Sequence, residues 1–157
     1  MSRSWGWGEK GERVGEAIPA GHGRSFTWLG AITSSGLLAT MTIEEATDGA
    51  IFQAFVEQVL CPRLRPGQVV VMDNLSAHKA AAVRQSLEAA GASLLYLPPY
   101  SPDLNPIEKC WSKIKLVLRS LKARTAEALE AAMHTALAAI SPDNARAWFH
   151  YCGYTKC

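Results

Sequence analysis

A proline-rich run that leads into a carboxylate constrains this chain more than any other stretch. Residues 97–111 read LPPYSPDLNPIEKCW. Proline fixes φ, and the residue before each proline is pushed into an extended conformation, so residues 97–102 cannot be helical. Asn105 then suits a helix N-cap, Pro106 the first helical position and Glu108 the third. The run therefore predicts one carboxylate held at the N-terminus of a helix.

Length and composition indicate a globular chain of about one domain. The 157 residues are 48% hydrophobic and 19% charged, and the net charge of +2 is too small to establish a polyanionic partner. No apolar run approaches the ~18 residues of a membrane span, and the first residues lack a signal-peptide core. The four cysteines form no CxxC pair and no metal-binding spacing. We therefore expect a reducing compartment, the cytoplasm (nucleoid-associated), and no association with a membrane.

The order of predicted elements indicates an α/β fold. Two β-like runs, residues 26–32 and 37–43, predict a hairpin. Thr47 or Asp48 can cap a helix whose apolar residues share one face and which Pro62 ends. The remaining predictions are, in order, a strand at residues 69–72, a helix from Ser76 to Ala90, a strand at 93–97, helices at 106–121 and 125–140, and a short final helix after Pro142. This order is typical of helices packed on a mixed sheet, with residues 1–24 as an irregular segment.

Two carboxylates follow neighbouring predicted strands. Asp73 comes directly after the apolar run Val69–Met72, which is typical of a strand buried on both faces of a mostly parallel sheet. Glu108 follows the next strand, and 34 residues separate the two acids. Sites in open α/β sheets form beyond the carboxyl ends of the strands. Two carboxylates at one such edge suit Mg²⁺, and two ions about 4 Å apart would suit phosphodiester cleavage.

Each of these residues also has an explanation that involves no catalysis. Asp73 and Asn74 are typical of an ordinary turn between a strand and a helix. Glu108, three residues after Asn105, also matches a capping box. His78, one turn into a predicted helix, is more often a surface or packing residue than a ligand. Taken one by one, these residues leave both explanations open.

A run of basic residues follows Glu108. Residues 109–124 contain no acidic side chain. Lys115 and Arg119 lie on the same side of the predicted helix as Glu108. A solvated helix more often mixes its charges, whereas a face of one sign beside a metal site suits a phosphate backbone. We therefore expect DNA contacts from Lys109, Lys113, Lys115, Arg119 and Lys122.

Two motifs carry a resemblance to a known family. Residues 70–79 read VVMDNLSAHK, and residues 97–108 read LPPYSPDLNPIE, followed by Trp111. Together with the spacing between the acids, they resemble the mariner-type DDE transposases, whose endonuclease domain is retroviral-integrase-like, and in particular their bacterial insertion-sequence branch. Residues 7–13 resemble the segment that follows the first acid of that family, and residues 148–154 resemble its C-terminal end. The resemblance covers nearly the whole chain.

The resemblance implies an RNase H-like mixed sheet flanked by helices, and an enzyme that cuts and joins DNA at the ends of a mobile element. It implies a two-ion site for Mg²⁺ or Mn²⁺, with Asp73 as the second metal-binding acid and Glu108 as the third. Asn74, His78 and Asn105 match motif positions that are expected to orient the acids or contact the DNA. The implied partners are transposon-end DNA and target DNA.

The resemblance also implies that part of the catalytic domain is missing. In the family, the first acid lies on the first, central strand of the sheet, upstream of the segment that residues 7–13 resemble. We therefore expect residues 1–157 to form a partial catalytic domain, with an irregular segment at 1–24, an RNase H-like core at 25–124 and C-terminal helices at 125–157. Such a chain is either a product of a split reading frame or a truncated copy. Another transposase chain or an upstream segment would supply the missing strand.

Two functions of different class follow. The first is a transposase catalytic domain that performs metal-dependent strand cleavage and strand transfer at insertion-sequence ends. The alternative is a catalytically inactive fragment that acts as a DNA-binding or inhibitory assembly module. A small-molecule α/β enzyme has little support, since the chain has no glycine-rich phosphate loop and no nucleophile elbow. A sheet without its central strand leaves buried backbone groups unpaired, so we also expect poor solubility or oligomerisation.

Overall fold

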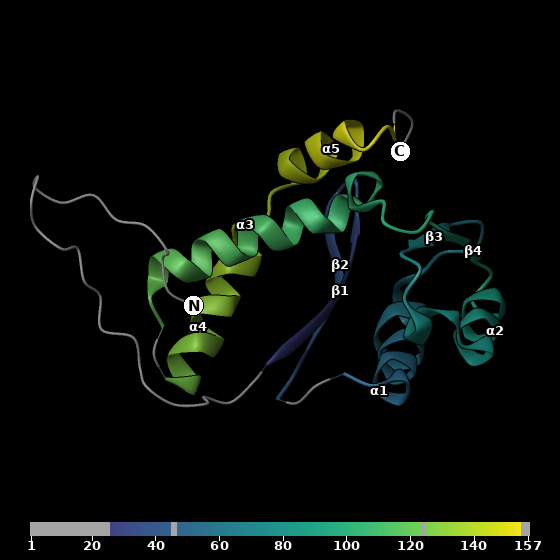
Figure 1. The fold of residues 1–157 in the computed structure, drawn as a ribbon, viewed down its shortest axis with the longest axis horizontal. Helices are drawn as coiled ribbons and strands as arrows, with labels where there is room; N and C mark the ends of the chain where they lie inside the picture. Colours follow the sequence, from purple (N-terminus) through teal and green to yellow (C-terminus); the bar gives the residue numbers. More distant parts are fainter. Residues whose placement is uncertain (1–25, 45–46, 124, 155–157) are drawn as a thin grey trace, which may run out of the picture.

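The computed structural model describes residues 26–44, 47–123 and 125–154. The predictions for residues 1–24, including the resemblance of residues 7–13, lie outside these ranges. Within them, no helix is both long enough and apolar enough to cross a bilayer. The predicted mixed α/β layout is confirmed (Figure 1). The elements are β1 (Thr27–Thr33), β2 (Gly36–Ile43), α1 (Gly49–Ala54), η1 (Phe55–Leu60), η2 (Cys61–Arg63), β3 (Val69–Met72), η3 (Ser76–Lys79), α2 (Ala81–Ala89), β4 (Ser93–Tyr96), η4 (Pro102–Leu104), α3 (Pro106–Leu121), α4 (Ala126–Ala138) and α5 (Pro142–Tyr151).

β1 and β2 form the predicted antiparallel hairpin. Their register runs from Thr33 opposite Gly36 to Thr27 opposite Ile43. Gly36 has a φ of +126°, a value that only glycine adopts without a steric penalty, so it can close the turn. The hairpin crosses the middle of the molecule, between α3 and α1 (Figure 1).

β3 and β4 form a separate two-stranded parallel sheet. Its register begins with Val69 opposite Ser93, and no ladder joins this sheet to the hairpin among the described residues. One face packs on helices, but on the other face Val69 is 59% exposed and Leu95 is 53% exposed. The prediction that Val69–Met72 is buried on both faces is therefore wrong for the described part of the chain, because no described element covers the second face.

The first predicted helix forms, but its hydrogen-bond pattern changes along its length. The Asp48 side chain accepts a hydrogen bond from the Ile51 amide (2.9 Å) and so caps α1. After Ala54 the chain continues as the π-helix η1 and then as the 3₁₀ turn η2, which contains Pro62. The predicted apolar face is buried at Phe52, Phe55, Val56 and Leu60.

The second predicted helix starts later than the sequence indicates. Ser76 opens the 3₁₀ turn η3 and its side chain caps no helix; α2 begins only at Ala81. Ala80, with an extended ψ of 135°, separates the two elements, and the Tyr96 hydroxyl donates a hydrogen bond to the His78 carbonyl (2.7 Å) on the η3 side of this break. The prediction of one helix from Ser76 is therefore wrong at its start.

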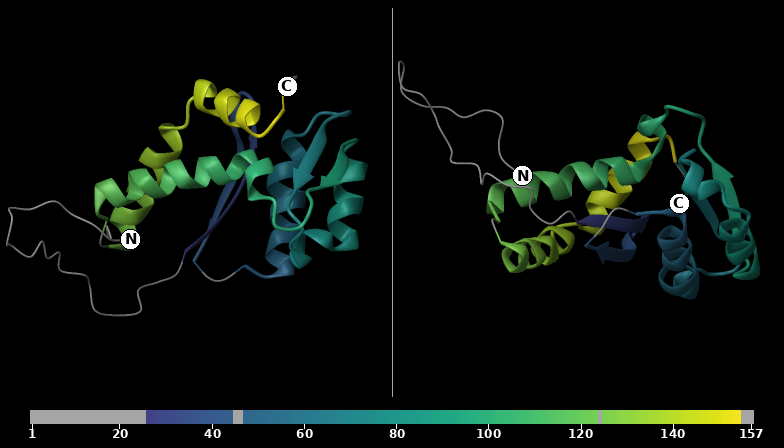
Figure 2. Two further views of the ribbon diagram at one scale, coloured as in Figure 1. Left: turned by 45° about the horizontal axis from the view of Figure 1, so that its top comes forward. Right: turned by 60° about the horizontal axis from the view of Figure 1, so that its bottom comes forward.

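The hairpin lies between α3 and α4 on one side and α1 on the other (Figure 1, Figure 2), and residues of the hairpin pack on two hydrophobic clusters. Leu29 and Met41 of the hairpin pack on one cluster, and Trp28 and Ile32 pack on the other, because successive side chains of a strand point to opposite faces. The buried members of the first cluster are Ala39, Phe52, Phe55, Val56, Leu60, Met72, Val83 and Leu87. Those of the second cluster are Cys110, Ile114, Leu118, Ala132, Met133 and Ala136, from α3 and α4.

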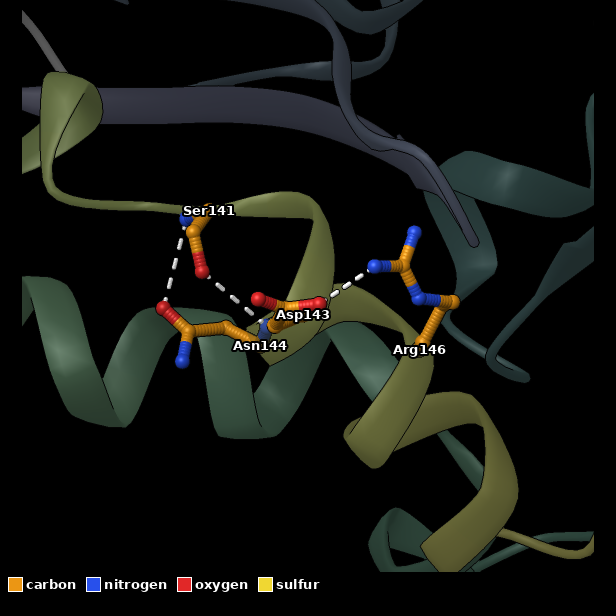
Figure 3. Close-up of polar contacts among 4 residues, drawn as sticks. All are labelled: Ser141, Asp143, Asn144 and Arg146. Carbon is orange, nitrogen blue, oxygen red and sulfur yellow. Dashed lines mark hydrogen bonds and ion pairs between the residues drawn. The ribbon is translucent and has the colours of Figure 1, made fainter.

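α3 has the predicted bounds and runs from the middle of the molecule to the end farthest from β3 and β4 (Figure 1). α5 packs against it and begins with a capping box. Ser141 Oγ accepts a hydrogen bond from the Asn144 amide, and Asn144 Oδ1 accepts one from the Ser141 amide, both 3.2 Å long (Figure 3). Asp143 and Arg146 form an ion pair on the exposed side of the same turn (Figure 3). The start of α5 is thus fixed beside α3.

Candidate active site

Asp73 lies directly beyond the carboxyl end of β3, as the sequence predicts. Its Oδ1 accepts a hydrogen bond from the Leu75 amide (3.2 Å) and lies 2.6 Å from Nδ1 of His78. Oδ2 accepts no hydrogen bond from the described residues, and the side chain is 39% exposed. The neighbouring Asn74 is half-buried, and its side chain forms no hydrogen bond with the described residues. One oxygen of the Asp73 carboxylate is therefore held, while the other is open to a cation.

His78 is half-buried and contacts Phe52, Tyr96 and Asp73. Its ring stacks on Phe52 of α1, with the ring centroids 4.2 Å apart, and its carbonyl is bound by the Tyr96 hydroxyl. Nδ1 lies close to the Asp73 carboxylate without the alignment of a hydrogen bond, so the contact is electrostatic. His78 is thus a packing residue that also contacts one of the two candidate acids.

Glu108 lies exposed in the first turn of α3. Its amide donates a hydrogen bond to the Asn105 carbonyl (3.1 Å), but the Asn105 side chain makes no capping hydrogen bond. The capping box is therefore absent, and the Glu108 carboxylate has no hydrogen bond or ion pair with any residue that the structure describes. The positive end of the helix dipole stabilises a carboxylate there, and this one is free to bind a ligand.

A rigid loop, residues 97–105, connects the surroundings of the two acids. The Leu97 amide donates a hydrogen bond to the Met72 carbonyl (2.8 Å), so the loop starts beside the residue that precedes Asp73. It ends one turn before Glu108. Among the described residues, no group of three acidic, histidine or cysteine side chains could hold a metal. Two open carboxylates nevertheless fit a hard cation such as Mg²⁺, which is often bound by one or two carboxylates together with water and substrate phosphate.

Lys115 and Arg119 continue the exposed side of α3 away from Glu108. Residues 108, 112, 115, 119 and 122 follow the spacing of one helical face, and all five are exposed. We call this face the α3 stripe. From Glu108 to Arg119 it extends roughly 16 Å, at 1.5 Å per residue. The structure therefore places two basic side chains in line with the free carboxylate.

Lys109 and Lys113 turn toward α5 instead. Lys109 Nζ lies 4.1 Å from the ring centroid of Tyr151, and Lys113 Nζ lies 2.5 Å from Asn144 Oδ1. Asn144 is the residue that closes the capping box of α5 (Figure 3). The five basic residues predicted to contact DNA are thus divided between the α3 stripe and the α3–α5 contact.

Several residues that support the candidate site were not identified from the sequence. Phe52 and Tyr96 hold His78, whereas Tyr151 and Asn144 contact the two inward lysines. The Tyr154 hydroxyl donates a hydrogen bond to the Leu104 carbonyl (3.0 Å) and so ties the end of the chain to the loop before α3. These partners lie 18 to 50 residues apart, so no local spacing reveals them.

Comparison with known proteins places the two motifs in a family. The family model of the DDE superfamily endonucleases matches residues 1–130. The chain is 29% identical over 115 residues to the transposable element Tc1 transposase of Caenorhabditis elegans, and 25% identical over 115 residues to the Tcb2 transposase of Caenorhabditis briggsae. Each match covers 71% of this chain and 42% of the relative. The chain thus spans less than half the length of these relatives.

Solved structures share the fold. The crystal structure of the Mos1 strand transfer complex matches with a TM-score of 0.78 and 22% identity, over 96% of this chain and 47% of that chain. The Mos1 transposase catalytic domain with raltegravir and Mn matches with a TM-score of 0.66 and 20% identity, over 82% of this chain and 75% of that chain. The predicted RNase H-like fold is thereby confirmed. With a family model that spans most of its length, the chain belongs to the DDE superfamily endonucleases and is similar to the Tc1/mariner transposases.

Proposed function

We propose that this chain is the catalytic domain of a transposase of the bacterial insertion-sequence branch, which cuts and transfers DNA strands at element ends in the cytoplasm. The observation that carries the proposal is the placement of two open carboxylates. Asp73 follows β3, and Glu108 opens α3 at the far end of the loop that begins beside Asp73. The Tc1 and Tcb2 relatives are transposases, and Mos1 structures contain Mn, Mg or transposon-end DNA.

In this proposal Asp73 and Glu108 hold the divalent cations of a two-ion site, Mg²⁺ or Mn²⁺. Such ions, when bound, stabilise charge on the phosphate and make a bound water more acidic. The role of the protein's own residues is to orient the two carboxylates. His78 keeps Oδ1 of Asp73 in one position and so directs Oδ2 outward, while the backbone of α3 alone fixes Glu108.

A strand from an upstream segment or from another transposase chain completes the sheet and supplies the remaining acid. The two described sheets are not hydrogen-bonded to each other, and Val69 and Leu95 leave one face of β3 and β4 uncovered. The Trp28 indole nitrogen on β1 is buried without a partner among the described residues. Open strand edges and an orphaned donor are what an absent neighbour would leave behind. Residues 25–124 would then be the RNase H-like core of the complete domain.

The DNA backbone follows the α3 stripe. Lys115 and Arg119 are exposed and lie in line with Glu108, so phosphates that they bind lead directly to the cation site. Lys109 and Lys113 contribute indirectly, because they hold α5 in place.

The alternative function is an inactive module that binds DNA or inhibits assembly. One observation favours it: the described residues offer two open carboxylates and no group of three metal-binding side chains. A site with two acids binds cations weakly. The basic residues of the α3 stripe would still bind DNA in such a module.

Cleavage of DNA that carries the sequences flanking the gene tests the proposal. The full chain, alone and joined to an upstream segment that contains a strand ending in Asp, is incubated with labelled duplex in Mg²⁺ or Mn²⁺. We expect cleavage of the labelled duplex, and chelation by EDTA should abolish it. Asp73→Asn and Glu108→Gln should each reduce cleavage to background. Glu130→Gln, an exposed carboxylate on α4, is the matched control and leaves cleavage unchanged.

The two functions predict different outcomes. DNA binding without cleavage, even after the upstream strand is supplied, would establish the inactive module and reject the enzyme. Cleavage that survives both Asp73→Asn and Glu108→Gln would remove these residues from the site.

A further inference from the structure

Tyr100 combines full exposure with an unfavourable backbone conformation. Its side chain is 101% exposed, and its φ of +56° lies in the left-handed region. Residues other than glycine avoid this region because Cβ crowds the backbone, and a bulky aromatic residue there is an outlier. Tyr100 and Lys122 are the two non-glycine residues with positive φ in the described part of the chain. A large apolar ring is thus held in solvent at a conformational cost.

The neighbours of Tyr100, rather than its own ring, impose this conformation. Leu97 is 7% exposed, its amide donates a hydrogen bond to the Met72 carbonyl, and two prolines follow it. After Tyr100, the Ser101 hydroxyl donates a hydrogen bond to the Pro99 carbonyl (3.3 Å), and η4 begins at once. The ring of Tyr100 packs on nothing that the structure describes. Strained residues that the surroundings over-determine occur preferentially at ligand-binding sites.

The position of Tyr100 relates it to both candidate acids. It lies three residues beyond Leu97, where the loop starts beside Asp73, and eight residues before Glu108. The loop that carries the ring is therefore the segment that connects the two sides of the candidate site. A rigid loop with an exposed ring at this place presents a flat apolar surface on the segment between the two candidate acids.

We propose that Tyr100 is a stacking residue for an unpaired nucleotide beside the candidate site. The inference rests on the proposed DNA-cleaving function and adds to it the residue that positions the strand. Aromatic rings stack on any base, because every base has a π-face, but only on a base that is unpaired or splayed out of the duplex. The ligand class is therefore a DNA strand with a locally unpaired base, and the ring rather than the hydroxyl makes the contact.

Binding to a forked duplex tests this proposal without any need for catalysis. The unpaired arm carries 2-aminopurine, whose fluorescence is quenched when an aromatic ring stacks on it. Because one base–aromatic stack is worth roughly 1–3 kcal/mol, we expect Tyr100→Ala to raise the dissociation constant about 5- to 150-fold and to abolish the quench. Tyr100→Phe keeps both affinity and quench. Leu95→Ala, an equally apolar exposed side chain on β4, is the matched control and changes neither.

A stability measurement separates a binding role from a structural one. Glycine accepts φ +56° without strain, so Tyr100→Gly is expected to leave the thermal midpoint unchanged or raise it by up to about 4 °C while losing the quench. A midpoint that falls by several degrees together with affinity would assign Tyr100 a structural role and overturn the proposal. Wild-type affinity and quench in Tyr100→Ala would also overturn it, with the proposed function intact. A wild-type chain that binds no forked DNA would reject the proposed function itself, and the stacking role with it.

Discussion

The two hydrophobic clusters hold the two candidate acids in different ways. The buried members of the first cluster come from strands and helices and include aromatic residues such as Phe52, whereas those of the second come from α3 and α4 alone and include small residues such as Ala136. Asp73 follows a strand of the first cluster, and Glu108 begins a helix of the second. Among the described elements, the hairpin alone packs on both clusters. The position of one acid relative to the other is therefore set by how the clusters meet across the hairpin, and not by either cluster alone.

The acids also differ in what surrounds them. The side chain of Asp73 is contacted on one oxygen, by the His78 ring and by the Leu75 backbone amide. Glu108 has no such contact with the described residues, and the backbone of α3 carries it. The first acid therefore depends on a packed histidine, and the second depends on where a helix begins.

Truncation of one core residue in each cluster should have the largest effect. Leu87 and Ile114 are both 0% exposed, so Leu87→Ala and Ile114→Ala should each lower the free energy of unfolding by about 2–5 kcal/mol. Urea denaturation followed by circular dichroism, at concentrations that keep the chain dispersed, measures both. Because the hairpin packs on both clusters, we expect each variant to shift one common transition. Two transitions, each moved by only one of the variants, would mean that the clusters unfold independently. Leu116→Ala, 65% exposed on α3, should cost within about 0.5 kcal/mol.

Crowding the contact between the hairpin and α3 should have the next largest effect. A Cβ added at Gly30 would lie 3.0 Å from the Trp111 ring, so Gly30→Ala forces the two apart and should cost about 1–3 kcal/mol. Gly49→Ala is the matched control, since nothing lies within 4 Å of the added atom. The comparison uses the same denaturation measurement. A cost at Gly49 equal to that at Gly30 would show that the hairpin contact does not join the clusters.

Burial raises the pKa of the Cys61 thiol at the first cluster and, more strongly, that of the Cys110 thiol in the second, so alkali should act mainly through Cys110. Burial raises the pKa of Cys110 from 9.0 to about 11, and Lys113 opposes part of that rise. Between these values the folded protein keeps a proton that the unfolded chain has lost. The free energy of unfolding therefore keeps its full value below pH 9 and falls by about 1–3 kcal/mol as the pH rises toward 11. Denaturation midpoints from pH 8 to 11 should show this loss in the wild type and in Cys61→Ala, but much less in Cys110→Ala. A pH profile that Cys110→Ala leaves unchanged would place the loss on other groups.

The smallest effects should distinguish the basic residues of the α3 stripe from the lysines of the α3–α5 contact. Lys115→Met and Arg119→Met should each reduce the slope of log affinity for DNA against log salt by about 1, because each removes a phosphate contact. Lys113→Met should leave that slope unchanged and instead lower stability by about 1 kcal/mol, since it loses the Asn144 contact. Salt titrations of DNA binding check the first result, and denaturation checks the second. Equal slopes for all three variants would contradict the division of the basic residues.

The structure confirms the predicted elements that are specified by neighbouring residues in the sequence. α3 starts at Pro106 because the prolines before it exclude a helix, and it ends at Leu121 as the apolar spacing indicates. The hairpin and the short final helix α5 also form as predicted, since a turn and a helix start depend on neighbouring residues. The placement of Asp73 after a strand also follows from the sequence.

Elements that depend on distant partners do not agree. α2 starts only after the extended Ala80, and the η3 turn before it is held by Tyr96, 18 residues away, through the His78 carbonyl. Val69 is exposed although its sequence context is typical of a buried strand, because no described element covers that face of the parallel pair. Apolar spacing indicates what a segment is able to bury, but not what covers it.

The sequence by itself determines that a rigid proline loop separates a carboxylate after a strand from a carboxylate at a helix start. Proline geometry, capping and apolar periodicity act within a few residues, so a single chain segment is enough to specify them. Only the tertiary structure decides that His78 contacts Asp73, that Lys113 turns to α5, and that Lys115 stays open. These outcomes depend on which faces of distant elements meet, because packing decides whether a charged side chain finds a partner inside the protein or remains available to a ligand.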